Sequence, residues 1–144
     1  FTGDMFGLSY RQFDVAGRSS IIPTTTPTQF DPEAMRASIE RLLALQPPAL
    51  YLTHFGQITG IERLGADLLR QLDEHVAVAL AARDTPPEQR HGAIRAGLTG
   101  LYLAEARRQG WPLAEPELLA WLETDIDLSA QGLDYWLNSL PPRA

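Results

Sequence analysis

The feature that most limits the possible folds of this chain is a change in the spacing of apolar residues near residue 60. Beyond that point, apolar residues recur every three or four positions over roughly five turns, which predicts a long amphipathic helix. Before it, the β-prone pieces SYRQFD and SII are separated by glycine and proline, which predicts extended segments and turns. The residues at helical spacing are Ile61, Leu64, Leu68, Leu72, Val76 and Leu80.

Two further elements are predicted before residue 60. Asp31 is placed to cap a helix whose first residue is Pro32, since aspartate suits the cap position and proline suits the first turn. The apolar run at 50–53 predicts a short buried strand. We therefore expect an α+β fold, with a β/α part at 1–60 and a mainly helical part at 61–144.

The helical part is expected to contain three helices after the first long one. Thr85 is placed to cap one helix, which should end at Gly110. Two shorter helices are expected across PELLAWLE and SAQGLDYWLNSL. Asp125 and Asp127 lie between these two segments, where they suit the cap of the last helix.

Composition argues against several kinds of partner and site. The 144 residues are 44% hydrophobic and 21% charged, as in globular proteins, and the net charge of −6 disfavours nucleic acid, whose phosphates need a concentrated basic face. The chain has no cysteine, so disulfides and cysteine-bound zinc are excluded. No run approaches the roughly 18 apolar residues of a membrane span. We expect a cytoplasmic protein without nucleic-acid or membrane partners.

Two polar residues follow predicted strand ends and are candidates for one site. Asp4 follows Phe1 and Thr2, which suit a strand, and His54 follows the predicted strand at 50–53. Strand ends commonly present polar groups to a crevice, where aspartate can bridge two cations and neutral histidine is a common metal ligand. Each residue also has a structural interpretation, because aspartate often caps a turn and a single histidine often lies in the core or on the surface.

Five other residues have weaker claims. Ser9, Tyr10 and Arg11 follow the Asp4 loop and either line a substrate pocket or belong to a loop that re-enters a strand. His75 is predicted to lie on a solvated helix face, and His91 in an exposed first helical turn. Neither histidine is expected to bind a metal.

Three stretches together resemble the C-terminal half of a metallo-β-lactamase-fold hydrolase: FTGDMFG, PTTTPTQFDPEAMRASIERLLAL and YLTHFG. The closing DLSAQGLDYWL resembles helical extensions in one bacterial branch of that superfamily. The resemblance implies a partial αββα sandwich followed by helices. It also implies that Asp4 bridges two divalent metal ions (zinc, with iron or manganese as alternatives) and that His54 is the last ligand of the second ion.

The chain departs from that superfamily in one important respect. It has no His-x-His-x-Asp-His motif, and its only histidines are His54, His75 and His91. A dinuclear site needs more ligands than two residues supply. The expectation is therefore a fragment without its N-terminal half, inactive alone, whose parent hydrolyses an ester, lactone, thioester or similar bond in a small molecule. A homodimer is one expected way to cover the exposed sheet, and the alternative function is a non-catalytic helical interaction or dimerisation module.

Overall fold

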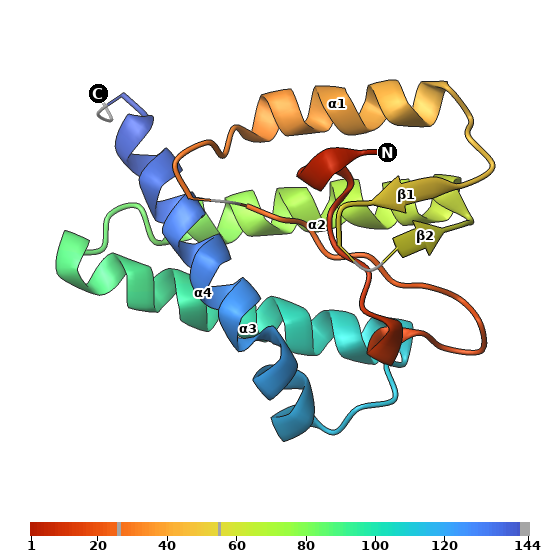
Figure 1. The fold of residues 1–144 in the computed structure, drawn as a ribbon. Coiled ribbons are helices and arrows are strands. Elements are labelled where there is room, and N and C mark those ends of the chain that lie inside the picture. The colour runs from red at the N-terminus through yellow and green to blue at the C-terminus, as the bar shows by residue number, and fades with distance from the viewer. Residues whose placement is uncertain (26, 55, 142–144) are drawn as a thin grey trace.

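The computed structural model describes residues 1–25, 27–54 and 56–141, and these residues form an α+β fold that is mostly helical. Thr26 and Phe55, which belong to motifs quoted above, lie outside the described residues. In Figure 1 the N-terminal segment lies between α1 and a small hairpin, and α2 runs beneath them. The elements are η1 (Gly3–Phe6), η2 (Arg11–Phe13), α1 (Pro32–Ala44), β1 (Leu50–Leu52), β2 (Gly56–Ile58), α2 (Ile61–Ala81), α3 (Pro87–Gln109) and α4 (Glu115–Ser139).

Helix α1 begins where the sequence predicts. One carboxylate oxygen of Asp31 accepts hydrogen bonds from the backbone N–H groups of Glu33 and Ala34, both at 3.0 Å. These bonds satisfy donors that have no partner inside the first turn. Ile39 is fully buried on the face that packs against α2.

Helix α2 confirms the predicted helical spacing and occupies the centre of the fold. It contacts α1, α3 and α4, and its inward residues Leu64, Leu68 and Leu72 are at most 1% exposed. Leu80, at the end of the predicted stripe, is 36% exposed, although its neighbours Ala79 and Ala82 are buried. The fold therefore packs around one amphipathic helix that could be recognised from spacing alone.

The start of α3 differs from the expectation. Pro86 rather than Thr85 holds the cap position, and no side chain bonds to the open backbone N–H groups of the first turn. The two prolines reduce the need for a side-chain cap, since proline has no N–H to satisfy. The other end is as predicted, because Gly110 adopts the left-handed conformation with a φ of 73° and closes the helix.

Helix α4 is one continuous helix of 25 residues, so the prediction of two shorter helices is wrong. Asp125 and Asp127 lie inside it, and their side chains bond to other elements instead of capping a helix: Asp125 accepts from Tyr10 and Asp127 from Arg95. The helix crosses α3 and also contacts α2 (Figure 1). Among the described residues, none of the helices is both long and apolar enough to cross a bilayer.

Strand structure is limited to one antiparallel hairpin within the described residues. Leu50 of β1 pairs with Ile58 of β2, and both side chains are buried. The predicted strand at Phe1 and Thr2 is not formed, and SYRQFD contains the one-turn helix η2. The N-terminal chain is shaped by turns with glycine at positive φ, so it forms only isolated bridges instead of continuous ladders.

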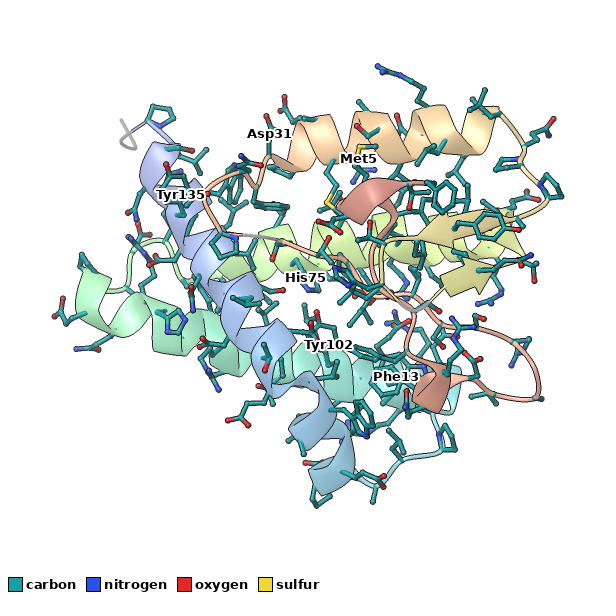
Figure 2. The ribbon with its side chains drawn as sticks, in the orientation of Figure 1. Met5, Phe13, Asp31, His75, Tyr102 and Tyr135 are labelled. Carbon is teal, nitrogen blue, oxygen red and sulfur yellow. The ribbon has the colours of Figure 1, made fainter. Side chains whose placement is uncertain are left out.

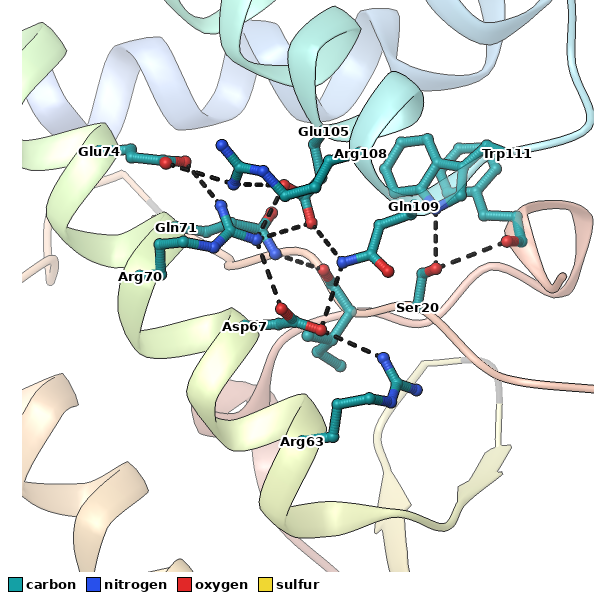
Figure 3. A network of polar contacts seen from close by, with 12 residues as sticks. Ser20, Arg63, Asp67, Arg70, Gln71, Glu74, Glu105, Arg108, Gln109 and Trp111 are labelled. Atoms are coloured by element: carbon teal, nitrogen blue, oxygen red, sulfur yellow. Dashed lines mark hydrogen bonds and ion pairs between the residues drawn. The ribbon is translucent and has the colours of Figure 1, made fainter.

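Hydrogen bonds to the later, helical part of the chain hold this irregular N-terminal segment. Gln71 of α2 donates to the carbonyl oxygen of Ile21 at 2.7 Å, and the indole N–H of Trp111 donates to the hydroxyl of Ser20 at 2.7 Å (Figure 3). Thr25 donates to the carbonyl oxygen of Ser129 in α4 at 3.1 Å. Buried polar groups without a sheet partner need such bonds. The segment that carries Asp4 is therefore fixed by the helical part.

A network of arginines and carboxylates joins α2 to α3 (Figure 3). Its centre is Glu105, which is only 3% exposed and receives Arg70 at 2.8 Å on both carboxylate oxygens. Arg108 and Gln109 donate to the same carboxylate at 3.1 and 2.9 Å. Arginine suits this role because its planar fork can bond both oxygens at once. The buried negative charge is thus fully paired.

Removing Glu105 should destabilise the protein. Glu105→Ala leaves Arg70, Arg108 and Gln109 without their shared acceptor, and we expect the free energy of unfolding to fall by about 2 kcal/mol. Urea denaturation measures the change. The matched substitution Glu123→Ala, at an exposed glutamate of α4, should stay within about 0.5 kcal/mol of the original. Equal effects of the two substitutions would contradict a structural role for the network.

Candidate functional site

The loop around Asp4 is built by the glycines on either side of it. Gly7 has a φ of 73°, and a Cβ at this position would lie 2.2 Å from the carbonyl oxygen of Ile22, so only glycine fits. The carbonyl oxygen of Asp4 accepts bonds from the N–H of Gly7 at 3.1 Å and the hydroxyl of Thr24 at 2.8 Å. These contacts form η1 and hold the Asp4 carboxylate at the protein surface, inside a turn and not at a strand end.

His54 lies in the turn that joins β1 and β2. The N–H of Thr2 donates to the carbonyl oxygen of Tyr51 at 3.1 Å, which ties the N-terminal segment to β1. That bond brings the turn carrying His54 next to the loop carrying Asp4. The two loops adjoin because η1 of the N-terminal segment packs against β1 of the hairpin.

The two predicted ligands, fifty residues apart in the chain, face each other. The Nε2 atom of His54 lies 3.7 Å from a carboxylate oxygen of Asp4, and both side chains are about half exposed, at 55% and 54%. Asp4 also borders a surface pocket of about 270 Å³ that reaches Met5, Gln29 and Asp31 near the start of α1. Figure 2 shows Met5 and Asp31 on this side of the molecule. The pair is therefore accessible to a ligand.

Of the three candidates Ser9, Tyr10 and Arg11, Tyr10 is the one that contacts α4. Its hydroxyl donates to the Asp125 carboxylate at 2.7 Å, and its ring lies 5.9 Å from that of Trp121. Ser9 is buried, and Arg11 bonds to the Ser9 hydroxyl and carbonyl oxygen. Those bonds, together with an ion pair to Asp14, close the loop on itself, but the segment leads into η2 and does not re-enter a strand as the structural interpretation expected.

Asp125 and Trp121 are neighbours of this site that the sequence interpretation missed. Burial raises the pKa of the Asp125 carboxyl, while the hydrogen bond from Tyr10 and the charge of a protonated His54 oppose that rise. Burial and Asp125 together raise the pKa of Tyr10. The available signal was the spacing of four residues between Trp121 and Asp125, which places both on one face of a helix.

His75 is buried, so the prediction of a solvated face is wrong. Its Nδ1 atom lies 2.8 Å from the carbonyl oxygen of Gln71, and its Nε2 atom lies 3.1 Å from the Tyr102 hydroxyl (Figure 2). A carbonyl only accepts, so Nδ1 carries the proton and Tyr102 donates to Nε2. Burial lowers the pKa of His75 to about 4. Both ring nitrogens are occupied, and His75 is a neutral core residue.

His91 also differs from the expectation, because it is half-buried in α3 and not exposed. Its Nε2 atom lies 3.4 Å from the Asp127 carboxylate, which also receives Arg95 at 2.5 Å. This contact joins α3 to α4 far from the chain that carries Asp4. His91 therefore belongs to the packing of the two helices.

No protein-family model, curated protein or solved structure matches this chain. Within residues 1–25, 27–54 and 56–141, no group of three or more histidine and acidic side chains is placed to hold a metal ion. The candidate site therefore consists of two facing side chains, Asp4 and His54, with Tyr10, Asp125 and Trp121 nearby.

The buried neutral His75 should make stability depend on pH. The unfolded chain takes up a proton near pH 6.5 and the folded protein near pH 4, so the free energy of unfolding should fall as pH drops through this window. The contribution is about 3 kcal/mol at 1.36 kcal/mol per pKa unit. In urea denaturation between pH 7 and pH 4, the free energy of unfolding should fall less for His75→Gln than for the original protein. The matched variant His91→Gln should lose as much free energy of unfolding as the original protein does. If His75→Gln and the original showed the same pH dependence, the assignment of His75 as a neutral core residue would be wrong.

Proposed function

We propose that the chain is the C-terminal portion of a metal-dependent hydrolase of the metallo-β-lactamase superfamily, with Asp4 and His54 as ligands of a two-metal site. One observation carries the proposal: donor atoms of two residues fifty positions apart lie 3.7 Å from each other on the surface. Both residues stand in the motifs, FTGDMFG and YLTHFG, that carry the sequence resemblance.

The separation of the two donor atoms fits a shared metal ion. A direct hydrogen bond would bring nitrogen and oxygen to about 2.7–3.2 Å. Two ligands each about 2.0–2.2 Å from one tetrahedral ion are instead roughly 3.3–3.6 Å apart. The observed 3.7 Å lies near the second range. Histidine nitrogen and carboxylate oxygen are also suitable donors for zinc, iron and manganese.

Metal ions bound there would supply a water of lowered pKa and polarise the carbonyl or phosphoryl oxygen under attack. The roles of this chain's residues follow from their positions. Asp4 would hold the metal ions through its carboxylate, and His54 would bind through Nε2 from a turn that the β1–β2 hairpin fixes. The remaining ligands would come from a His-x-His-x-Asp-His segment outside these 144 residues. The substrate would be a small molecule with an ester, lactone, thioester or similar bond.

A second candidate function is a helical interaction or dimerisation module. It is favoured by three exposed apolar residues at intervals of seven on α4: Trp121, Leu128 and Tyr135, at 41%, 43% and 53% exposure. Such spacing forms one stripe along a helix and suits contact with another helix. This function requires no metal, so metal binding separates the two candidates.

Substituting either ligand should remove metal from the full-length protein. We expect Asp4→Asn and His54→Ala each to weaken zinc binding by at least about a hundred-fold, because even residues behind the ligands contribute 10–100-fold. Hydrolysis of ester or lactone substrates should fall with it. The measurements are metal content after dialysis and calorimetric zinc titration. The controls Asp73→Asn and His91→Ala should keep both properties, and unchanged binding in Asp4→Asn and His54→Ala would refute the proposal.

The 144-residue chain on its own should behave differently from its parent. With two ligands it should bind zinc only weakly and should not hydrolyse ester or lactone substrates, because stable zinc sites have three or four protein ligands. Zinc titration and a hydrolysis assay with and without chelator measure this. Turnover that disappears on chelation would show that the isolated chain already holds a complete site.

A further inference from the structure

Asp125 differs from every other carboxylate of comparable burial. Among the described residues it makes no ion pair with an arginine, and its hydrogen-bond donor is the neutral hydroxyl of Tyr10 at 2.7 Å. The charge of a protonated His54 acts on Asp125, although no ion pair joins the two side chains. Taking a carboxylate partly out of water costs free energy unless a cation or several donors compensate. Each of the other buried or half-buried carboxylates contacts an arginine: Asp14, Asp67, Glu74, Glu105, Asp127 and Asp134.

Two aromatic rings lie near this carboxylate, since the Tyr10 hydroxyl bonds to it and the Tyr10 ring contacts that of Trp121. The rings of Tyr10 and Trp121 lie 5.9 Å apart with their planes inclined at 57°, and Trp121 is 41% exposed. Trp121 lies one helical turn before Asp125 on the same face of α4. On its other side Tyr10 packs against Phe13, whose ring stacks on buried Trp111 at 4.3 Å. The tyrosine ring is therefore held in place from behind.

A carboxylate beside two inclined aromatic faces is suited to an organic cation. Ring faces carry negative charge density that attracts ammonium groups, with tryptophan the strongest, and quaternary ammonium ligands are commonly bound between aromatic rings. Tyr10 donates to one oxygen of Asp125, which fixes the carboxylate and leaves its other lone pairs for a ligand. The net charge of −6 favours approach of a cation.

We infer that Tyr10, Trp121 and Asp125 form a subsite for an organic ammonium group beside the Asp4–His54 pair. As a statement about the substrate, this inference rests on the proposed hydrolase function: the substrate then carries an amine or quaternary ammonium group away from the bond that is cleaved. As a binding site, it requires no metal. The subsite also gives α4 a role in substrate choice, because two of its three residues belong to that helix.

Choline is a suitable probe, with its neutral carbon isostere dimethylbutanol as the comparison ligand. Both are titrated into the full-length protein after removal of metal, and the indole N–H signals are followed in a proton–nitrogen correlation spectrum, with Trp121 assigned from Trp121→Phe. We expect choline, and not dimethylbutanol, to shift the Trp121 signal. Trp111, whose indole is bonded to Ser20, should not respond. Equal shifts with both ligands, or none with choline, would overturn the inference.

Substitutions locate the charge that choline recognises. Asp125→Asn keeps an acceptor for Tyr10 but removes the charge, and choline binding should weaken about ten-fold. Asp127→Asn, two residues along the same helix, should leave it unchanged. Tyr135→Ala, at an exposed aromatic about 15 Å from Asp125 along α4, should also leave it unchanged. If Asp125→Asn binds choline as tightly as Asp127→Asn does, the subsite is wrong.

The two proposals can fail separately. Choline binding in a protein that holds no zinc and hydrolyses nothing would retain the subsite and reject the hydrolase. Zinc-dependent hydrolysis in a protein whose Trp121 signal does not shift with choline would retain the hydrolase and reject the subsite.

Discussion

The packing of α2 against its neighbours is the constraint on which the rest of the structure depends. A Cβ on Gly65 of α2 would lie 2.4 Å from a methyl carbon of Leu43 in α1. A Cβ on Gly97 of α3 would likewise lie 2.5 Å from a methyl carbon of Val78 in α2. Both helices thus approach α2 so closely that a larger residue at either glycine would displace the Leu43 or Val78 side chain. This close contact places Gln71 where it holds the carbonyl oxygen of Ile21, and through it the irregular N-terminal chain.

The candidate site therefore depends on both parts of the chain. Asp4 and His54 come from residues before 60, yet the segment that presents Asp4 has few backbone partners of its own. It is held by the Gln71 side chain of α2 and by the Ser129 carbonyl oxygen of α4. Tyr10 extends this link by bonding to Asp125. The buried apolar residues likewise form one core that includes residues of both parts. A substitution in a distant helix can consequently shift the site without touching it.

Local signals were sufficient where a single stretch determines its own structure. The Asp31 cap and the apolar stripe of α2 could be predicted because their hydrogen bonds and spacing are encoded within a few turns. The continuity of α4 could not, because Asp125 suits a cap until its partner Tyr10, 115 residues away in sequence, is known. The burial of His75 could not be predicted either. Its polar neighbours in sequence indicated a solvent-exposed helix face, whereas its partner Tyr102 lies on another helix. The approach of Asp4 to His54 was predicted from two strand ends and from motif resemblance, although Asp4 lies in a turn and not at a strand end.

The distribution of charge partners separates structural carboxylates from the candidate functional ones. Arginines neutralise the carboxylates that hold helices together, most completely at Glu105, where two guanidinium groups share one buried side chain. Among the described residues, Asp125 has no arginine partner. A fold that pairs its other partly buried acids with arginine has the means to pair Asp125 as well. Local departures from such a rule are expected where ligands bind, since a ligand then supplies the missing cation. On this reasoning we propose that an ammonium group compensates Asp125, as a metal ion would compensate the more exposed Asp4 in the proposed two-metal site.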